Sequence, residues 1–221
     1  MTTLYLGNLN YSSWSIRAVL VTRGAGLDVE EKVLPIGADE SYALLDAETG
    51  QHRVPALKTG DLVVHDSLAI TEWAAEQAGP GKVWPIDPVK RARARSLCAE
   101  MHASFIDIRS FMGVDIRSRH PLPTLSGGLK WDVERIVQLW EETRAAYASD
   151  GPYLFGEWSA ADAFYMPVAT RFRTYGYALD GASEAYAQAV LSHPLSLQLI
   201  EEAKAEPWTL DPTKFKPKSA G

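Results

Sequence analysis

The chain has 221 residues, and 46% of them are hydrophobic, which is enough to build one large domain or two small ones around a buried core. That hydrophobic share excludes an intrinsically disordered protein. The formal net charge of −6 argues against a general nucleic-acid-binding protein, which needs a basic face. It leaves room for a local basic pocket that binds an anionic small molecule.

The single cysteine, Cys98, excludes an intramolecular disulfide and fits a reducing compartment. The first residues, MTTLYLGNLN, lack the basic segment and long apolar run of a signal peptide. The sequence contains no stretch of about 18 apolar residues, so we expect no membrane span. We therefore expect a cytoplasmic protein with no membrane or nucleic-acid partner, and we expect no metal site.

Apolar runs and turn signals alternate in the first third of the chain. Residues 3–6 form a short β-type run, and the apolar residues of "SIRAVLV" then recur with helical spacing, so we expect a helix over 13–23. "VEEKVLP" at 29–35 predicts a second strand. Residues 41–47 predict a short helix.

The segment "VPALKTGDLVVHDS" contains the clearest hairpin signal of the chain. Strand-type runs at 54–57 and 62–64 flank a Thr-Gly-Asp turn. We expect Ser67 to cap a following helix that ends at Gly79. The resulting order β-α-β-α-β-β-α suggests a thioredoxin-like domain, an α/β unit with a mixed four-stranded sheet.

The segment "GPGKVWPIDP" interrupts this pattern with prolines and glycines and predicts a linker over 79–87. Beyond it, helices are expected over 88–118, 128–149, 159–177, 181–191 and 194–205. We therefore expect the thioredoxin-like domain over 1–78 and an all-α domain over 88–221. The tail from Pro207 is expected to be extended along the surface or frayed.

Three motifs in this order resemble the glutathione S-transferase family over residues 3–205. "HRVPAL" followed by "DSLAI" is similar to the family's glutathione-binding hairpin. "SSWSIRAVLVTRGAGLDVEE" resembles its first active-site helix, nearest the serine-using zeta and tau-like classes. "EWSAADAF" resembles the capping box of its central C-terminal helix, in which Ser159 and Asp162 serve folding.

The resemblance implies a cosubstrate and an activity. Glutathione would be the cosubstrate, and its thiolate would be transferred to an electrophilic small molecule, a detoxification reaction. The alternatives are a glutathione-dependent isomerase, peroxidase or reductase, or a non-catalytic glutathione-binding module. The resemblance also implies a homodimer.

In the family, the proline corresponding to Pro55 is cis, and the backbone of the preceding residue, here Val54, pairs with the cysteinyl part of glutathione. The bland alternative is a proline that merely begins an edge strand. His52 and Arg53 would reach the glycyl carboxylate, although two basic side chains beside a strand are as often simply solvated.

The resemblance assigns the γ-glutamyl end of glutathione to Asp66 and Ser67. Ser67, at a helix N-terminus, would offer its hydroxyl and backbone N–H to the carboxylate, and Asp66 would receive the amine. A plain helix cap is the alternative for Ser67, and the two roles are compatible because they share one geometry.

The serine run raises the question of which hydroxyl meets the thiol. A hydroxyl that donates one hydrogen bond at a helix N-terminus favours the reactive thiolate. The ungapped match places this role on Ser12 and leaves Ser13 and Ser15 as helix caps. A shift of one residue would put the role on Ser13, and Tyr11 could donate instead. The zeta class has a cysteine where this chain has Trp14.

The helical half would supply the pocket for the second substrate. The alternative for the apolar stripes of these helices is that they form the core of the helical bundle. Arg109 and Arg171, which lie beside the stripes, suggest an acidic or electron-rich electrophile. Arg17 either anchors the first helix or contributes to the field over the thiol. Cys98 lies far from the first helix start, so we expect no cysteine-based redox role.

Overall fold

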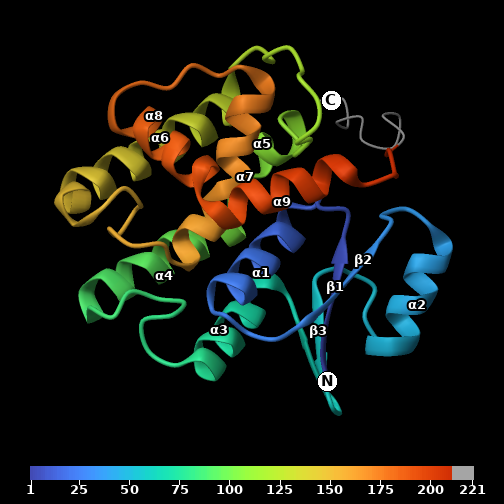
Figure 1. The fold of residues 1–221 in the computed structure, drawn as a ribbon. Coiled ribbons are helices and arrows are strands. Elements are labelled where there is room, and N and C mark those ends of the chain that lie inside the picture. Colours follow the sequence, from blue (N-terminus) through green and yellow to red (C-terminus); the bar gives the residue numbers. More distant parts are fainter. Residues whose placement is uncertain (211–221) are drawn as a thin grey trace.

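The computed structural model describes residues 1–210 and contains one four-stranded sheet with the strand order β2-β1-β3-β4 (Figure 1). The strands are β1 (Thr2–Gly7), β2 (Glu30–Leu34), β3 (Ala56–Thr59) and β4 (Leu62–His65). The β1–β2 pair is parallel, whereas β1–β3 and β3–β4 are antiparallel. The expected mixed four-stranded sheet is therefore confirmed.

Helices cover both faces of the sheet. Helices α1 (Ser13–Gly24) and α3 (Ser67–Ala78) pack against each other on one face, and α2 (Asp39–Thr49) lies on the other (Figure 1). Side chains alternate between the faces of a strand. Accordingly, Leu4 and Leu6 of β1 join the large core, while Tyr5 packs with Leu45 of α2 in a separate small cluster.

The elements that follow the sheet in the described chain are helical. They are α4 (Pro88–Ala103), α5 (Ile106–Phe111), α6 (Gly127–Tyr147), the short 3-10 helix η1 (Ala148–Asp150), α7 (Ala160–Tyr175), α8 (Gly181–Ser192) and α9 (Pro194–Ala205). A thioredoxin-like part followed by helices is thus confirmed as the fold class. No helix of the described part is long and apolar enough to cross a membrane.

The single helix expected over 88–118 is wrong. Helix α4 ends at Ala103, and Phe105 takes a left-handed conformation with φ 62° before the short α5 begins. The break is stabilised from both sides. Arg109 donates hydrogen bonds to the carbonyl oxygens of Met101 and Ser104. On the other side, a carboxylate oxygen of Asp132 accepts the first two backbone N–H groups of α5 at 3.0 Å each.

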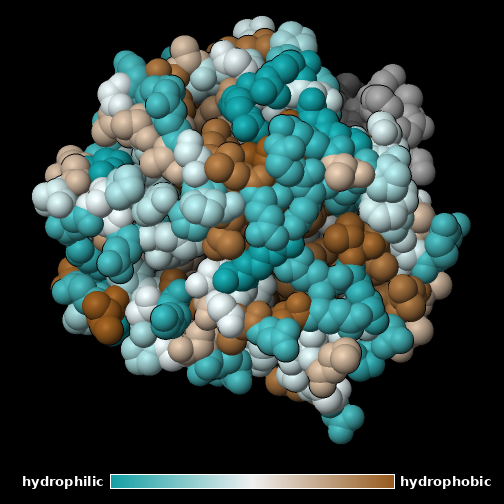
Figure 2. Space-filling view, in the orientation of Figure 1, coloured by the Kyte–Doolittle hydropathy of each residue, from teal (hydrophilic) through white to brown (hydrophobic). Residues whose placement is uncertain are grey.

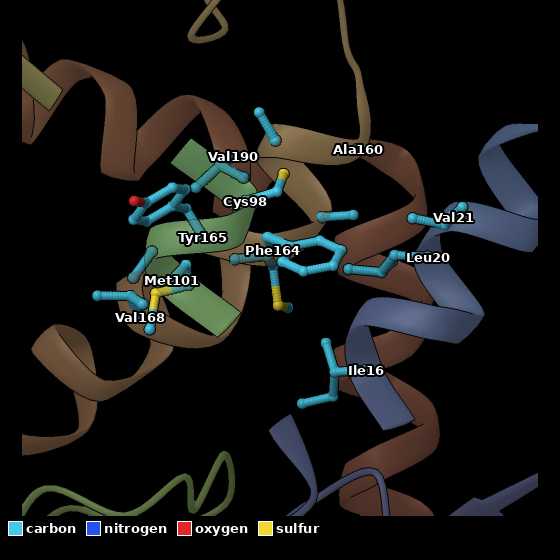
Figure 3. Packing of buried hydrophobic residues seen from close by; sticks show 14 of the residues in the cluster. Ile16, Leu20, Val21, Cys98, Met101, Ala160, Phe164, Tyr165, Val168 and Val190 are labelled. Atoms are coloured by element: carbon cyan, nitrogen blue, oxygen red, sulfur yellow. The ribbon is translucent and has the colours of Figure 1, made fainter. Parts of the chain in front are cut away.

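Helix α7 is the centre of the helical half and contacts α1, α4 and α8. Figure 3 shows Ile16, Leu20 and Val21 of α1 facing Phe164 of α7. One hydrophobic cluster therefore continues from the sheet into the helices. The linker over 79–87 stays a prediction. Part of this segment belongs to the hydrophobic core, because Trp84 is buried there. The expected tail lies outside the described residues from position 211 onward.

The face seen in Figure 2 is mostly hydrophilic, with small separate hydrophobic patches. Such a surface is typical of a protein whose large apolar side chains are mostly buried in its core.

The start of α7 is held by a capping box. The carboxylate of Asp162 accepts the backbone N–H groups of Ser159 at 2.9 Å and Leu154 at 3.1 Å. Asp162 is fully buried, and this burial raises the pKa of its carboxyl to about 6. The box ties the loop before α7 to the most buried helix of residues 1–210, so the folding role expected for Ser159 and Asp162 has a structural basis.

Asp162→Ala should lower the free energy of unfolding by roughly 2–4 kcal/mol, because two buried N–H donors lose their acceptor. Chemical denaturation at pH 8, where the carboxylate is ionised, measures this. The control is Asp150→Ala, which removes an exposed ion pair to Lys90 and should cost less than about 1 kcal/mol. Equal losses in the two variants would contradict the role of the box.

Candidate functional site

A pocket of about 720 Å³ opens where α1 and α3 both begin. Its walls come from the start of α1, the connection from β2 into α2, the segment before β3 and the segment from β4 into α3. Its lining residues are Gly7, Ser12, Trp14, Leu34, Pro35, Ile36, Ser41, Tyr42, Leu45, Gln51, His52, Arg53, Val54, Pro55, His65, Asp66 and Ser67. All six residues expected to bind glutathione and one of the two catalytic candidates therefore lie around one pocket.

Ser12 is the N-cap of α1 and lines the pocket. Its Oγ accepts the backbone N–H of Ser15 at 3.2 Å and lies 2.9 Å from the Ser15 hydroxyl. The Ser15 Oγ in turn accepts the backbone N–H of Gly7 at 2.9 Å. The expectation that Ser13 and Ser15 cap the helix is therefore wrong: Ser12 is the cap, and Ser15 joins it to the end of β1.

The two other candidates for the thiol contact lie elsewhere. The Tyr11 hydroxyl accepts hydrogen bonds from Arg117 at 3.1 Å and from the backbone N–H of Leu210 at 3.4 Å, so it faces the end of the described chain. Ser13 is buried in the first turn of α1. Neither Tyr11 nor Ser13 is among the described residues that line the pocket.

The Val54–Pro55 peptide bond is cis, as the resemblance implied. Pairing of β3 with β1 begins at Ala56, so the expected strand over 54–57 starts two residues later than predicted. The backbone of Val54 thus lies just before the paired part of β3, at the wall of the pocket.

Asp66, rather than Ser67, is the N-cap of α3, which corrects the sequence prediction. Asp66 has a positive φ of 77°, and its Oδ1 accepts the backbone N–H of Leu68 at 2.8 Å. Its Oδ2 lies 3.4 Å from Nε2 of His102. The Oγ of Ser67 is buried at the helix start and has no hydrogen-bond partner among the described residues. This free hydroxyl is an unused donor in the pocket wall.

His52 and Arg53 lie at the exposed rim of the pocket. The Nε2 atom of His52 is 3.7 Å from a carboxylate oxygen of Asp46, and its side chain is 76% exposed. Sequence reasoning missed His65 and Tyr42, which also line the pocket. His65 adjoins the DSLAI motif and could have been suspected from it, whereas Tyr42 carries no sequence signal because it comes from a helix on the other face of the sheet.

Trp14 joins the pocket to basic side chains from α1, α4 and α5. The ring of His102 meets the Trp14 ring edge-on, with centroids 5.0 Å apart. The guanidinium carbons of Arg17 and Arg109 lie 4.7 Å and 5.0 Å from the same ring centroid. Burial lowers the pKa of His102.

Cys98 is fully buried, and burial raises the pKa of its thiol well above the usual value. A thiol held protonated and out of contact with solvent is a poor nucleophile. Within residues 1–210, no group of three or more His, Cys, Asp or Glu side chains is arranged to hold a metal ion.

Comparison with known proteins agrees with this geometry. Residues 11–77 match the family model described as glutathione S-transferase, N-terminal domain. The chain is 25% identical over 179 residues to glutathione S-transferase L1 of Arabidopsis thaliana, covering 79% of this chain and 68% of that protein.

Two solved structures illustrate the shared fold. A glutathione transferase homolog from Burkholderia gl BGR1, solved with bound glutathione, is 20% identical and covers 93% of this chain and 99% of its own, with a TM-score of 0.70. A maleyl pyruvate isomerase, a bacterial zeta-class glutathione S-transferase, is 23% identical and covers 93% and 98%, also with a TM-score of 0.70.

The fold and the pocket define a protein of the two-part class in which a thioredoxin-like sheet precedes a helical bundle. Residues 11–77 are a glutathione S-transferase N-terminal domain, and the fold of the chain is the one that glutathione S-transferases share. Glutathione as cosubstrate fits this assignment.

Proposed function

We propose that this protein is a glutathione transferase that joins the glutathione sulfur to an electrophilic small molecule. The observation that carries the proposal is the Ser12 hydroxyl, which stands at the N-terminus of α1 in the wall of a pocket shared with Val54 and Ser67. In a substitution of an aryl chloride, the sulfur forms a new bond to carbon, and chloride leaves with the electron pair of the broken bond.

The γ-glutamyl end of glutathione fits the start of α3. The Ser67 hydroxyl has no partner among the described residues, and the helix N-terminus adds backbone N–H donors and partial positive charge. Together they suit the α-carboxylate. Asp66 lies beside them; its Oδ1 caps the helix, and its Oδ2, 3.4 Å from Nε2 of His102, would receive the amine.

The remaining parts of glutathione extend along the segment before β3. The backbone of Val54 would pair with the cysteinyl part as an added strand does. His52 and Arg53 stand at the rim, where a positive charge would attract the glycyl carboxylate. Because both side chains are exposed, we expect their contribution to affinity to be small.

Ser12 would stabilise the thiolate rather than act as a nucleophile. In the structure the Ser12 hydroxyl donates to the Ser15 hydroxyl, which also accepts the Gly7 N–H. Because hydroxyl protons rotate, a bound thiolate would reverse this bond, so that Ser15 donates to Ser12 and Ser12 donates to the sulfur. Each donor in such a chain polarises the next. A hydrogen bond to the anionic form lowers the thiol pKa, so more of the bound glutathione is reactive at neutral pH.

A glutathione-dependent isomerase is the second candidate, and the likeness to the zeta-class maleyl pyruvate isomerase favours it. Both reactions need the same activated sulfur. A peroxidase, a reductase or a non-catalytic binding module of the same fold would also retain the pocket. Retention on immobilised glutathione, followed by turnover of 1-chloro-2,4-dinitrobenzene, separates a transferase from a module that only binds.

Ser67→Ala should weaken glutathione binding by roughly ten- to a hundredfold, because a hydrogen bond to a charged group is lost. Isothermal titration calorimetry measures the dissociation constant directly. Ser96→Ala, on the exposed face of α4, is the matched control and should leave binding unchanged. An unaltered affinity in Ser67→Ala would remove the γ-glutamyl assignment.

Ser12→Ala should lower turnover of 1-chloro-2,4-dinitrobenzene at neutral pH while glutathione affinity stays nearly intact. The lost hydrogen bond should move the thiol pKa toward its free value of about 8.5, so activity recovers as the pH rises. The pH dependence of kcat/KM measures this shift, and each unit corresponds to about 1.4 kcal/mol.

The other serines provide the controls. Ser15→Ala should shift the profile in the same direction by a smaller amount, because Ser12 loses its own donor, whereas Ser13→Ala should leave it unmoved. A shift in Ser13→Ala together with an unchanged profile in Ser12→Ala would transfer the role to Ser13.

We also propose a cytoplasmic homodimer. Exposed apolar side chains at the tip of the β3–β4 hairpin and around the start of α4, including Leu62, Ile86 and Val89, support a surface that another chain covers. Sedimentation equilibrium at micromolar concentration should give twice the mass of the chain. A single-chain mass under these conditions would contradict the dimer.

A further inference from the structure

The connection from β1 to α1 leads directly into Ser12 and is buried. Leu9 is 3% exposed and Asn10 is 0% exposed. Buried backbone N–H groups need acceptors. The carbonyl oxygen of Asn8 accepts the N–H groups of Tyr11 at 3.0 Å and of Ser12 at 2.8 Å. The N–H groups of Leu9 and Asn10 must therefore find their acceptors outside the connection.

A carboxylate from the far end of the described chain accepts these two N–H groups. Glu206 follows α9, and the chain leaves this helix beside the connection (Figure 1). Its Oε1 accepts the N–H of Leu9 at 2.6 Å, and its Oε2 accepts that of Asn10 at 3.2 Å. Both carboxylate oxygens thus complete the hydrogen bonding of a connection that lies 197 and 196 residues earlier in the sequence.

Asn10 joins the same connection to the segment between α5 and α6. Its Nδ2 donates to Oδ1 of Asp115 at 2.9 Å, and its Oδ1 accepts the backbone N–H of Arg117 at 2.9 Å. Its carbonyl oxygen accepts the N–H of Ile116 at 3.3 Å. Because both ends of the Asn10 amide are engaged, only one orientation of this side chain satisfies them.

Arg117 holds the segment that carries Glu206. Its guanidinium donates to the carbonyl oxygens of Glu206 at 2.7 Å and Trp208 at 2.6 Å, and to the Tyr11 hydroxyl at 3.1 Å. The Glu206 carboxylate is therefore kept at the connection. Neither Arg117 nor Glu206 is among the described residues that line the pocket, so any effect on bound glutathione has to pass through the chain.

The direction of the Ser12 hydroxyl depends on this connection. Ser12 has the extended dihedral angles φ −92° and ψ 93°, so its backbone continues the connection rather than the helix. A hydrogen bond weakens steeply when the donor points away from the acceptor. Without the Glu206 carboxylate, two buried N–H groups would lack an acceptor, and a connection that rearranged to satisfy them would turn Ser12.

We propose that Glu206 and Arg117 are positioning residues, which hold the connection from β1 to α1 so that the Ser12 hydroxyl points at the glutathione sulfur. The inference rests on the role proposed above for Ser12 and adds the residues that keep it in place. A donor fixed in this way needs little reorganisation when the thiolate forms.

The test is the pKa of the bound glutathione thiol, which the ultraviolet absorbance of the thiolate reports without any acceptor. Glu206→Gln keeps the size of the side chain but replaces one acceptor oxygen with an NH2 group that faces a backbone N–H. It should raise the thiol pKa by roughly 0.5–1 unit and lower kcat/KM at neutral pH roughly three- to tenfold, while glutathione affinity stays nearly intact. The titration runs from neutral to alkaline pH, where Glu206 is ionised although burial raises its pKa.

The matched control is Glu201→Gln on α9, because the exposed Glu201 pairs with Lys204 and should leave the thiol pKa unmoved. Arg117→Gln keeps the Glu206 carboxylate but removes its tether, so it should shift the pKa in the same direction by a smaller amount. It also gives an answer if Glu206→Gln does not fold. Residues needed only for stability would lower the melting temperature and the activity at every pH without moving the thiol pKa.

A double-mutant cycle shows whether Glu206 acts through Ser12. In the Ser12→Ala background, Glu206→Gln should move the thiol pKa no further. An additive shift would overturn the positioning role, and so would an unmoved pKa in both Glu206→Gln and Arg117→Gln.

The same measurements separate this inference from the proposed function. If Ser12→Ala raises the thiol pKa but the Glu206 and Arg117 variants do not, the positioning role fails and the role of Ser12 stands. An unchanged thiol pKa in Ser12→Ala would remove both roles. If the wild-type protein does not turn over 1-chloro-2,4-dinitrobenzene yet the pKa shifts follow the expected pattern, the transferase function fails and the positioning role stands.

Discussion

The packing of α1 between the sheet and α7 is the constraint on which the rest of the molecule depends. Ile16 and Leu20 bury their side chains against Phe164, and the same helix packs on α3 across the sheet face. Because α1 is enclosed in this way, its N-terminus can only lie at the pocket. Any shift of α1 would move Ser12, Trp14 and Arg17 together, since all three belong to it or its cap.

Some of the buried polar groups near α1 and α7 have hydrogen-bond partners, and others have none. At the start of α7, buried donors meet the Asp162 carboxylate, so the cost of burial is offset locally. At the pocket, the Ser67 hydroxyl is buried without a partner in the described chain, and behind Trp14 the three guanidinium nitrogens of Arg17 are buried in the same way. The buried polar groups at the start of α7 are thus hydrogen-bonded, whereas some of those beside the pocket are not. Unpartnered buried groups that reduce stability are typical of binding sites.

Several features were predictable because they depend on neighbours in the sequence. Alternating runs and turn residues placed the four strands within a few residues of their true ends, and the S-x-x-D pattern identified the box at Ser159. The break after Ala103 could not be predicted, because the helical spacing continues through it. The break is stabilised by hydrogen bonds from Arg109 to carbonyl oxygens and by the carboxylate of Asp132, which is distant in the sequence.

The helix caps also show which features the local sequence predicts and which ones the tertiary contacts decide. Ser and Asp are both good N-caps, so local preference could not choose between Ser12 and its neighbours or between Asp66 and Ser67. The structure resolves both choices through partners distant in the chain: Ser15 is engaged by Gly7 of β1, and Asp66 lies near His102 of α4.

The sequence by itself determined the order of the elements, the fold class, and the motifs that gather around the pocket, because these follow from periodicity, turn chemistry and short-range spacing. Only the tertiary structure decided which hydroxyl lines the pocket, that Tyr11 turns away from it, and that Arg17 and Arg109 meet at the ring of Trp14. The physical reason is that burial and charge proximity depend on the packing of three helices, and no local pattern in the chain records that packing.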